Sequence, residues 1–504
     1  MMRVGRRVLD AGTLLGVALL LGRFSGFGRE WVLASTLGLS TQADIAIIVL
    51  TIPDLLVNLL LSGGIGVALI PALRTVDTQQ AGRLCLQASL LVFGLYACFG
   101  LILAVVPGWV FGLLAPGVHD VAASFNGWLL YAVAAAIPLA ALSGVSTAAL
   151  NAQNRFFVAG CGTLIFNTCI MAALGWAVVQ SGNYLLFLCA GIFMGTLLRW
   201  LSQIYVLDGF SVRAARGLFT DWQIDGQLIR SFGAGIGAAS LLVLVPVMLR
   251  SVASWLGDGE VAAFNYATKL VELPSGILIT TLATVAFPRL SQAHGDRNQH
   301  AFSSILNQAV RRAVVLSVAV ILCGWPLMAD VVAVLFAASH ADLAGQTHVA
   351  RMAQIALLSL PGIGFSSLLA AGLNARRQPG RVFDAAGMAV LMLPLWMVPG
   401  WYWHRPEFLI AAVPAFYAFY SWVLWWRARA TDMHLGAWLG SGLSGRLMCM
   451  CLVAVVFFLS LDWVGGHLAE VPPVVMVGVR LLLGGVCFMG LLWIGRGQSP
   501  TPGH

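Results

Sequence analysis

Three charged residues stand inside an apolar stretch near the start of the chain, in the segment GRFSGFGRE at positions 22–30. Arg23 and Arg29 are separated by about 120° around an ideal helix, so they share one broad face only if the helix bends. Gly26 and its neighbouring glycines favour such a bend and allow another backbone to approach closely. The segment therefore predicts a membrane helix with charge on an inward face.

Charge at this depth points to binding chemistry. An arginine at the centre of a membrane helix costs about 2.5–3.5 kcal/mol on insertion scales, so we expect both arginines to face a wet interior. There a guanidinium binds an anion through charge-assisted hydrogen bonds. The alternative is a structural salt bridge of either arginine with Glu30, Asp44 or Asp54. The excess of positive over negative side chains favours an anion-binding cavity.

A second charged pair stands in the segment NYATKLVELPSG at positions 265–276. Lys269 is the only lysine in the chain, and Glu272 follows it at i+3, which places both on one helix face. Pro274 predicts an interrupted helix, and irregular backbone at membrane depth is tolerated only where it lines a cavity or protein interior. Lys269 either binds an anion or serves to neutralise Glu272, and both interpretations stay open.

A third segment, PDLLVNLLLSGGIG, begins at Pro53. Proline kinks a helix, and Gly63 and Gly64 loosen this one further. Asp54 lies on one face with Asn58, where both either bind a polar ligand or support the kink. The predicted helix breaks or gating positions are Gly26, Pro53, Gly63, Gly64 and Pro274.

The composition places these residues in a membrane protein. Of the 504 residues, 60% are hydrophobic and 10% are charged, whereas soluble domains carry about 25% charged residues. The sequence predicts an all-α polytopic fold with about fourteen transmembrane helices, because each needs about 20 apolar residues. The predicted spans are 9–37, 42–73, 80–107, 119–152, 156–180, 183–208, 226–257, 259–288, 303–337, 348–376, 380–402, 405–430, 440–463 and 472–495.

Loop charges orient these helices. With the N-terminus in the cytoplasm, the inside loops hold the arginines and the outside loops hold only Arg405, as the positive-inside rule requires. The loops are too short for a catalytic domain, so we expect no enzyme. The net charge of +8 is dispersed over these loops, which argues against a nucleic-acid partner. The nine cysteines show no metal-binding spacing, so we expect no metal site.

An internal repeat divides the chain. ALNAQNR at 149–155 matches GLNARRQ at 372–378, a shift of 223 residues, and two further matches have shifts of about 220. Six helices separate the copies, so the copies have one membrane orientation, an arrangement that secondary transporters use to bind substrate between halves. The predicted parts are a six-helix lobe at 1–208, a second at 209–430, and two extra helices with a tail at 431–504.

These motifs resemble those of one transporter family. Its members open with a pattern like S-R-x-x-G-F-x-R-D, followed by x-x-D-A-F, L-P-N-L-L-R and E-G-A-F. The corresponding stretches here are GRFSGFGRE, TQADIA, IPDLLVN and SGGIG. NAQNRF and YATKLVELPSGIL also fit. Over nearly its whole length the chain resembles the MurJ (MviN) family of bacterial lipid II flippases, part of the multidrug/oligosaccharidyl-lipid/polysaccharide (MOP) exporter superfamily.

The resemblance implies a substrate site. By position, Arg23 and Arg29 match the family's cavity arginines in the first helix, and Asp44 matches its aspartate at the start of the second. Lys269 stands where the family has an arginine in the eighth helix, and Glu272 matches an acidic position after it.

Three departures make this site sparser than the family pattern. Val57 replaces the second-helix arginine, Ser62 replaces a glutamate, and Thr268 replaces an aspartate. They leave room for a relative that moves another polyprenyl-linked sugar.

The resemblance implies a flippase that moves lipid II from the inner to the outer leaflet by alternating access. The alternatives are a related flippase for an O-antigen or exopolysaccharide precursor, and a cation-coupled drug antiporter. The basic first helix argues against a site for cationic drugs. We expect no cofactor, with the membrane potential or a monovalent cation as the candidate source of coupling energy. The expected partners are the lipid-linked oligosaccharide and membrane lipids, around a monomer in the bacterial inner membrane with both termini cytoplasmic.

The topology generates a first testable prediction. Single cysteines at positions 114, 182 and 466 are expected to react with an impermeant thiol reagent added to intact cells, whereas cysteines at 78, 214 and 379 are not. The chain's own cysteines fall in apolar segments. Labelling of the unmodified protein measures how much these native cysteines react, and this signal is subtracted. A reversed pattern at any two of these loops would contradict the fourteen-helix topology.

Overall fold

The computed structural model describes residues 2–59, 65–118, 127–180, 182–208, 222–337, 343–429, 448–458, 460–461 and 473–496. Over these ranges the chain is almost entirely helical and contains no β-strand. A helix satisfies its own backbone hydrogen bonds, which a bilayer interior demands. The predicted all-α fold is therefore confirmed. Packing divides the chain into two compact units, Met1–Ala262 and Ala263–His504.

Eleven helices in the described ranges are long and apolar enough to cross a membrane. They coincide with eleven of the fourteen predicted spans. The other three, 9–37, 226–257 and 440–463, correspond to α1, to α10 and to a shorter apolar helix at Met448–Phe458, which fall outside that set. The structure thus supports a multi-pass membrane protein, while the number fourteen stays a prediction.

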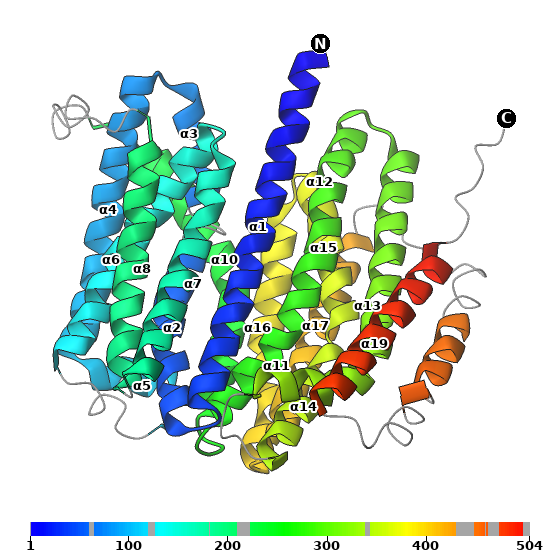
Figure 1. The fold of residues 1–504 in the computed structure, drawn as a ribbon. Coiled ribbons are helices and arrows are strands. Elements are labelled where there is room, and N and C mark those ends of the chain that lie inside the picture. The colour runs from blue at the N-terminus through cyan, green and yellow to red at the C-terminus, as the bar shows by residue number, and fades with distance from the viewer. Residues whose placement is uncertain are drawn as a thin grey trace. The chain divides into compact units, whose positions relative to one another are not determined.

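The first unit is built around one central helix, α6. Its helices are α1 (Met2–Leu37), α2 (Thr41–Leu59), α3 (Ile65–Thr75), α4 (Thr78–Val105), α5 (Pro107–Leu114), α6 (Gly127–Ala152), α7 (Phe156–Val179), α8 (Tyr184–Val206), α10 (Gly226–Ala253) and the start of α11 (Glu260–Pro274). α6 packs against α2, α3, α4, α7 and α8, and lies between α4 and α8 in Figure 1. Its many alanines, glycines and serines let neighbouring helices approach closely.

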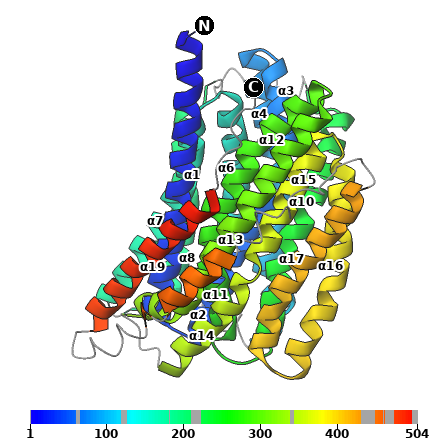
Figure 2. The same ribbon diagram turned by 90° about the vertical axis from the view of Figure 1, so that its right-hand side faces the viewer.

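The second unit has a similar centre in α15. Its elements are the remainder of α11, a π-helix at Ser275–Ile279, α12 (Thr280–Gly295), α13 (Gln299–Leu335), α14 (Leu343–Leu357), α15 (Leu360–Ala375), α16 (Pro379–Tyr402), α17 (Pro406–Arg429), helix Met448–Phe458 and α19 (Pro473–Arg496). α15 packs against α12, α13, α16 and α17 (Figure 2). Pro361 near its start corresponds to Pro138 of α6 under the shift of the sequence repeat.

The repeat is also visible in backbone geometry. Asn154 and Arg377, which the same shift relates, both have left-handed backbone conformations, with φ of 60° and 59°. Each ends its helix in a Schellman motif, which satisfies carbonyl groups at the helix terminus. The closing N–H···O bonds run from Arg155 to Leu150 at 2.8 Å and from Gln378 to Leu373 at 3.0 Å. The matching motifs ALNAQNR and GLNARRQ therefore encode one turn twice.

Two further pairs of positions are related by nearly the same shift. Asp77 caps α4 by accepting the N–H of Gln80, and Asn298 caps α13 by accepting that of Ala301. Gly38 and Gly259 both have positive φ, at 59° and 81°. These positions support the repeat on which the predicted lobes 1–208 and 209–430 depend. The lobe boundaries adjoin residues 209–221 and 430–447, which lie outside the described residues, so the division stays a prediction.

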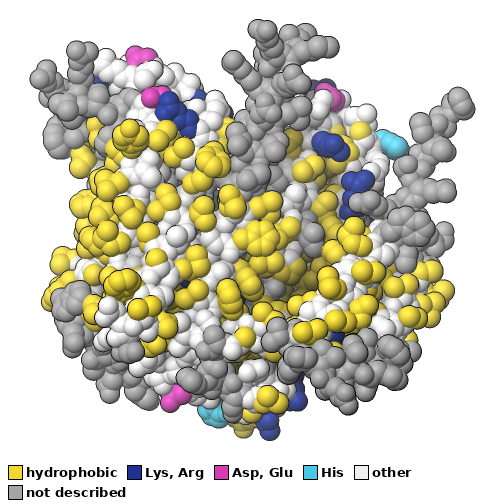
Figure 3. Space-filling view, viewed as in Figure 1, with side chains coloured by type: hydrophobic (Ala, Val, Ile, Leu, Met, Phe, Trp, Pro, Cys, Tyr) yellow, Lys and Arg dark blue, Asp and Glu magenta, His cyan; other side chains and the backbone are white. Residues whose placement is uncertain are grey.

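The surfaces of the helices suit a lipid environment. In the face that Figure 3 presents, hydrophobic side chains cover the flanks of the helices, and charged side chains gather toward helix ends. Large apolar residues such as Leu101 on α4 and Leu391 on α16 are exposed. A transmembrane helix requires this pattern, because lipid tails solvate apolar side chains and exclude charge.

Gly259 provides a prediction on stability. A Cβ there would lie 2.9 Å from the carbonyl carbon of Leu39, whereas a Cβ on Gly38 would meet nothing within 4 Å. Gly38→Ala is expected to cost only the strain of a side chain in the left-handed region, about 1–2 kcal/mol. Gly259→Ala adds a steric conflict, so it should unfold at a lower temperature than Gly38→Ala in detergent. Equal melting temperatures for the two variants would contradict the close contact.

Candidate functional site

The charge cluster predicted in the first segment forms around Arg29 of α1. Its Nη2 lies 2.8 Å from Oε1 of Glu30 and 3.1 Å from Oδ2 of Asp54. Its Nη1 donates a hydrogen bond to Oδ1 of Asn167 on α7 at 3.3 Å. Arg29 and Glu30 are buried, whereas 41% of the Asp54 side chain is exposed. The salt-bridge alternative considered for Arg29 is therefore realised here.

Glycines on α1 make this arrangement possible. A Cβ on Gly26 would lie 3.6 Å from Nδ2 of Asn167, and a Cβ on Gly28 would lie 3.2 Å from Sδ of Met171. These small residues let α1 pack along α7. The predicted close approach of another helix is confirmed. α1 continues as a helix through Gly26, and a gating role for this residue stays a prediction.

Arg23 has different surroundings from Arg29. It is exposed, although it lies on the same helix and only six positions earlier. The angle of about 120° between the two side chains accounts for the difference, since α1 presents one of them to α7 and the other elsewhere. Arg23 is thus the accessible arginine of this segment.

Asp44 is fully buried near the start of α2. Its Oδ2 accepts the N–H of Gly259 and its Oδ1 accepts the N–H of Ala262, both at 2.7 Å. These N–H groups lie at the N-terminus of α11, where backbone donors have no partner within the helix. Asp44 therefore caps α11 although the two are distant in sequence. This placement gives Asp44 a structural role, and its predicted contact with substrate stays a prediction.

Lys269 and Glu272 form the pair that their spacing predicts. Lys269 Nζ lies 2.6 Å from Oε2 of Glu272, with 27% and 55% of the two side chains exposed. An exposed pair of this kind contributes little stability, about 0.3–0.5 kcal/mol. It can therefore open at small cost to admit another anion.

Of the predicted helix breaks, Pro274 coincides with a change in helix type, whereas α2 continues as a helix through Pro53, and a gating role for either stays a prediction. After Pro274 the hydrogen-bond pattern changes to a π-helix at Ser275–Ile279, and the chain then continues as α12. Pro53 lies inside α2, directly before Asp54. π-helical turns are frequent at functional sites. Gly63 and Gly64 lie outside the described residues.

The three departures from the family pattern are less informative in structure. Val57 is partly buried on α2. The Thr268 hydroxyl donates to the carbonyl of Phe264 at 2.9 Å, so it serves its own helix. Ser62 lies outside the described residues.

Arg199 is a candidate that the sequence patterns above do not single out. This arginine is buried within α8, with 7% of its surface exposed. Its Nε lies against Gly162 of α7, where a Cβ would approach it to 2.9 Å. The available signal was an arginine inside the apolar run FMGTLLRW. The charges of the first helix and of the loops were the more conspicuous features.

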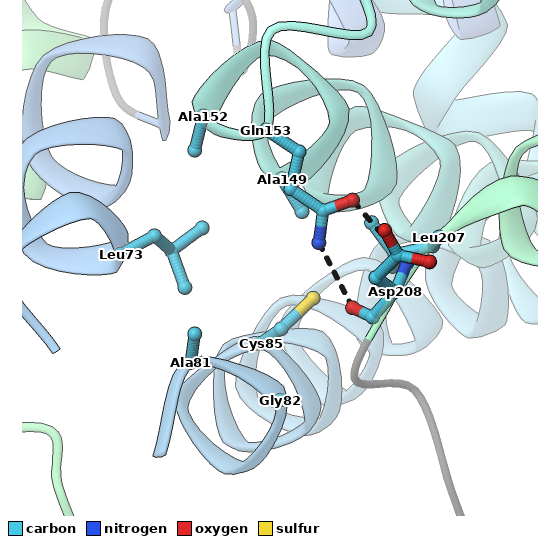
Figure 4. Close-up of a pocket in the computed structure, with 9 residues that line it drawn as sticks. All are labelled: Leu73, Ala81, Gly82, Cys85, Ala149, Ala152, Gln153, Leu207 and Asp208. Atoms are coloured by element: carbon cyan, nitrogen blue, oxygen red, sulfur yellow. Dashed lines mark hydrogen bonds between the residues drawn. The ribbon is translucent and has the colours of Figure 1, made fainter. Parts of the chain in front are cut away.

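A recess at the ends of α4, α6 and α8 does not provide the substrate site. Figure 4 shows Gln153 and Asp208 exchanging two hydrogen bonds above Cys85. The cavity beside them measures about 60 Å³, whereas ligand pockets occupy about 300–1,000 Å³. The recess is therefore a packing feature at the α6 and α8 termini.

Comparison with known proteins places this architecture. The chain is similar to a solved structure of a lipid II flippase MurJ in an inward closed conformation, with a TM-score of 0.76, 16% identity, and coverage of 96% of this chain and 98% of that one. It is also similar to an inward-facing multidrug resistance MATE family transporter of the MOP superfamily, with a TM-score of 0.66, 14% identity, and coverage of 83% and 96%.

Sequence comparison is more specific. A relative described as lipid II flippase MurJ, from Burkholderia cenocepacia, is 23% identical over 497 residues, which cover 94% of this chain and 95% of the relative. The family model described as lipid II flippase MurJ matches residues 33–395. The chain belongs to the MurJ family.

The range matched by the MurJ family model includes some of the candidate site residues and leaves out others. The matched range includes Asp44, Asp54, Arg199 and the Lys269–Glu272 pair. It begins after Arg23 and Arg29, so the role of these first-helix arginines stays a prediction. The MurJ family consists of transporters, which agrees with a cluster of charges held between helices.

The Asp44 cap generates a prediction that distinguishes a structural role of this carboxylate from a role in binding substrate. Asn at this position has one acceptor oxygen and presents an NH₂ group to an N–H donor. Asp44→Asn is expected to destabilise the protein by about 1.5–3 kcal/mol, the range for hydrogen bonds to charged groups. Thermal unfolding in detergent measures the loss, with the exposed Asp296→Asn as a control of equal charge change. An unchanged melting temperature together with lost lipid II binding would instead make Asp44 a ligand of the substrate.

Proposed function

We propose that this protein is a flippase that moves lipid II, an undecaprenyl-diphosphate-linked sugar–peptide, from the inner to the outer leaflet. The observation that carries the proposal is the match of residues 33–395 to the lipid II flippase MurJ family. Alternating access of a substrate site is the mechanism that transporters with repeated halves commonly use. The protein acts as a transporter, not an enzyme.

The accessible cations are the candidate diphosphate ligands. Arg23 is exposed, and Lys269 retains 27% exposure beside Glu272. Arginine donates two hydrogen bonds in a fixed fork, while lysine acts as a compact point charge. Arg29 is buried against two carboxylates, so it can take a phosphate oxygen only after one of them moves. We infer that the exposed Arg23 is reached by the diphosphate before the buried Arg29, and that Lys269 is a separate candidate ligand in the second unit.

The setting follows from the family and from the charge pattern. We place the protein in the bacterial inner membrane as a monomer with both termini in the cytoplasm. It needs no cofactor. The membrane potential acts on charge that crosses the bilayer with about 2.3 kcal/mol per charge per 100 mV, and either this potential or a monovalent cation supplies the coupling energy.

A second candidate substrate is another polyprenyl-diphosphate glycan, such as an O-antigen or exopolysaccharide precursor. The observation that favours it is the loss of a cation at Val57 and of acids at Ser62 and Thr268. Fewer charged side chains leave fewer contacts specific to one headgroup.

The charge at Lys269 provides the test. In vesicles reconstituted with labelled lipid II, Lys269→Arg is expected to retain transport because it keeps the cation. Lys269→Gln removes a charged hydrogen bond worth about 1.5–3 kcal/mol, so transport is expected to fall about 10- to 100-fold. The double variant Lys269→Gln with Glu272→Gln removes both charges and is expected to remain as slow as the single one.

Recovery of transport in the double variant would show that Lys269 serves only to neutralise Glu272. The wild-type protein could instead fail to move lipid II while it transports a different lipid-linked glycan in the same vesicles. That result would make the second candidate the substrate. Protein content of the vesicles is the control for each variant.

A further inference from the structure

Both terminal nitrogens of Arg29 are occupied in this structure. Their hydrogen bonds go to Glu30, Asp54 and Asn167, at 2.8, 3.1 and 3.3 Å. A diphosphate oxygen that approaches this end of Arg29 must therefore compete with a carboxylate already in place. The cluster needs a carboxylate that can leave and a place for it to go.

Asp54 is the carboxylate that can leave. Its side chain is 41% exposed, whereas that of Glu30 is 4% exposed. Departure of Glu30 would require a path through packed protein, while Asp54 stands at the open side of the cluster. Pro53 directly before it removes a backbone hydrogen bond of α2, which makes the local helix easier to deform.

Arg199 is the cation with which Asp54 can pair after it leaves Arg29. Its side chain is buried in α8, and α8 packs against α2, which carries Asp54. Within the described residues the Arg199 guanidinium makes no hydrogen bond, and its Nε is buried without an acceptor. Asp54 is a carboxylate within electrostatic range of this cation, and no salt bridge joins the two within the described residues. A buried guanidinium without acceptors is costly, so contact with a carboxylate would be favourable.

Gly162 gives Arg199 the room that it needs. A Cβ at this position would lie 2.9 Å from Nε of Arg199 and 2.9 Å from Nε2 of Gln203. Gln203 is held in turn by Ser143 and Thr147 of α6. The first unit thus buries a second guanidinium whose Nε has no acceptor among the described residues.

We propose that Arg199 is the alternate partner of Asp54, and that Asp54 moves from Arg29 to Arg199 when the substrate diphosphate binds Arg29. This inference rests on the proposed function, since it assumes a diphosphate substrate. No proton or electron is transferred. One ion pair opens, and two form: Arg29 with the diphosphate and Arg199 with Asp54. Arg199 is a positioning residue that touches no substrate atom.

The exchange makes a specific prediction for paired substitutions. Arg199→Gln leaves Asp54 without its alternate partner, so lipid II binding to the purified protein is expected to weaken about tenfold, in line with the loss of one charged hydrogen bond. Asp54→Asn removes the competitor of the diphosphate at Arg29, so binding is expected to be at least as tight as in wild type. The double variant is expected to bind like Asp54→Asn, because Arg199 matters only while Asp54 is charged.

The affinity for lipid II is measured in nanodiscs by tryptophan fluorescence for the wild-type protein, the two single variants and the double variant. Arg199→Lys, which keeps the cation, is a second variant that should retain most of the affinity and guards against misfolding of Arg199→Gln. Arg74→Gln is the matched control, since Arg74 is an exposed arginine of the same unit bound to the carbonyl of Asn151. It should bind as wild type does.

Two outcomes of these measurements would overturn the inference. An equal loss of affinity from Arg199→Gln with and without Asp54→Asn would make Arg199 either a direct ligand or a purely structural residue, because the effect would not pass through Asp54. Unchanged affinity in Arg199→Gln would show that Asp54 needs no alternate partner. If the wild-type protein does not bind lipid II at all, the proposed function fails rather than this exchange.

Discussion

A buried guanidinium has to find acceptors, and the first unit is arranged to supply them to Arg29. Without a partner this charge would be too costly to keep away from water. α1 lies against α7 at glycine positions so that Asn167 reaches it, and α2 contributes Asp54. Glu30 comes from the adjacent position of α1 itself. Three helices are thereby held in register by one side chain.

Such a cluster is a poor way to gain stability. Desolvation of buried ions offsets much of their attraction, and well-packed apolar residues would often serve as well. Its presence in an otherwise apolar unit therefore points to function. The same reasoning applies to Arg199, whose buried Nε finds no acceptor among the residues that the structure describes. A buried charge that lacks hydrogen bonds in one conformation is stabilised by a second conformation that supplies them.

The carboxylate of Asp44 follows the opposite logic. Both its oxygens receive backbone N–H groups at 2.7 Å from the start of α11, and the left-handed backbone of Gly259 permits this contact. The helix terminus carries a partial positive charge that favours an anion. A fully satisfied carboxylate of this kind is rigid, so Asp44 holds a helix in place while Asp54, which is partly exposed, remains able to change partners.

Much about this protein is determined by its sequence alone. Apolar runs of membrane length dictate helices, since no other open structure satisfies backbone groups in lipid. The repeat is readable because short-range turn chemistry is local: ALNAQNR and GLNARRQ end their helices with the same left-handed turn. The Lys269–Glu272 pair at i+3 is equally local. Only the tertiary structure decided which arginine is buried, that Asp44 caps a helix distant in sequence, and that Arg199 stands near Asp54. These outcomes depend on which helix faces pack together, and spacing along one helix carries no information about the acceptors that another helix presents.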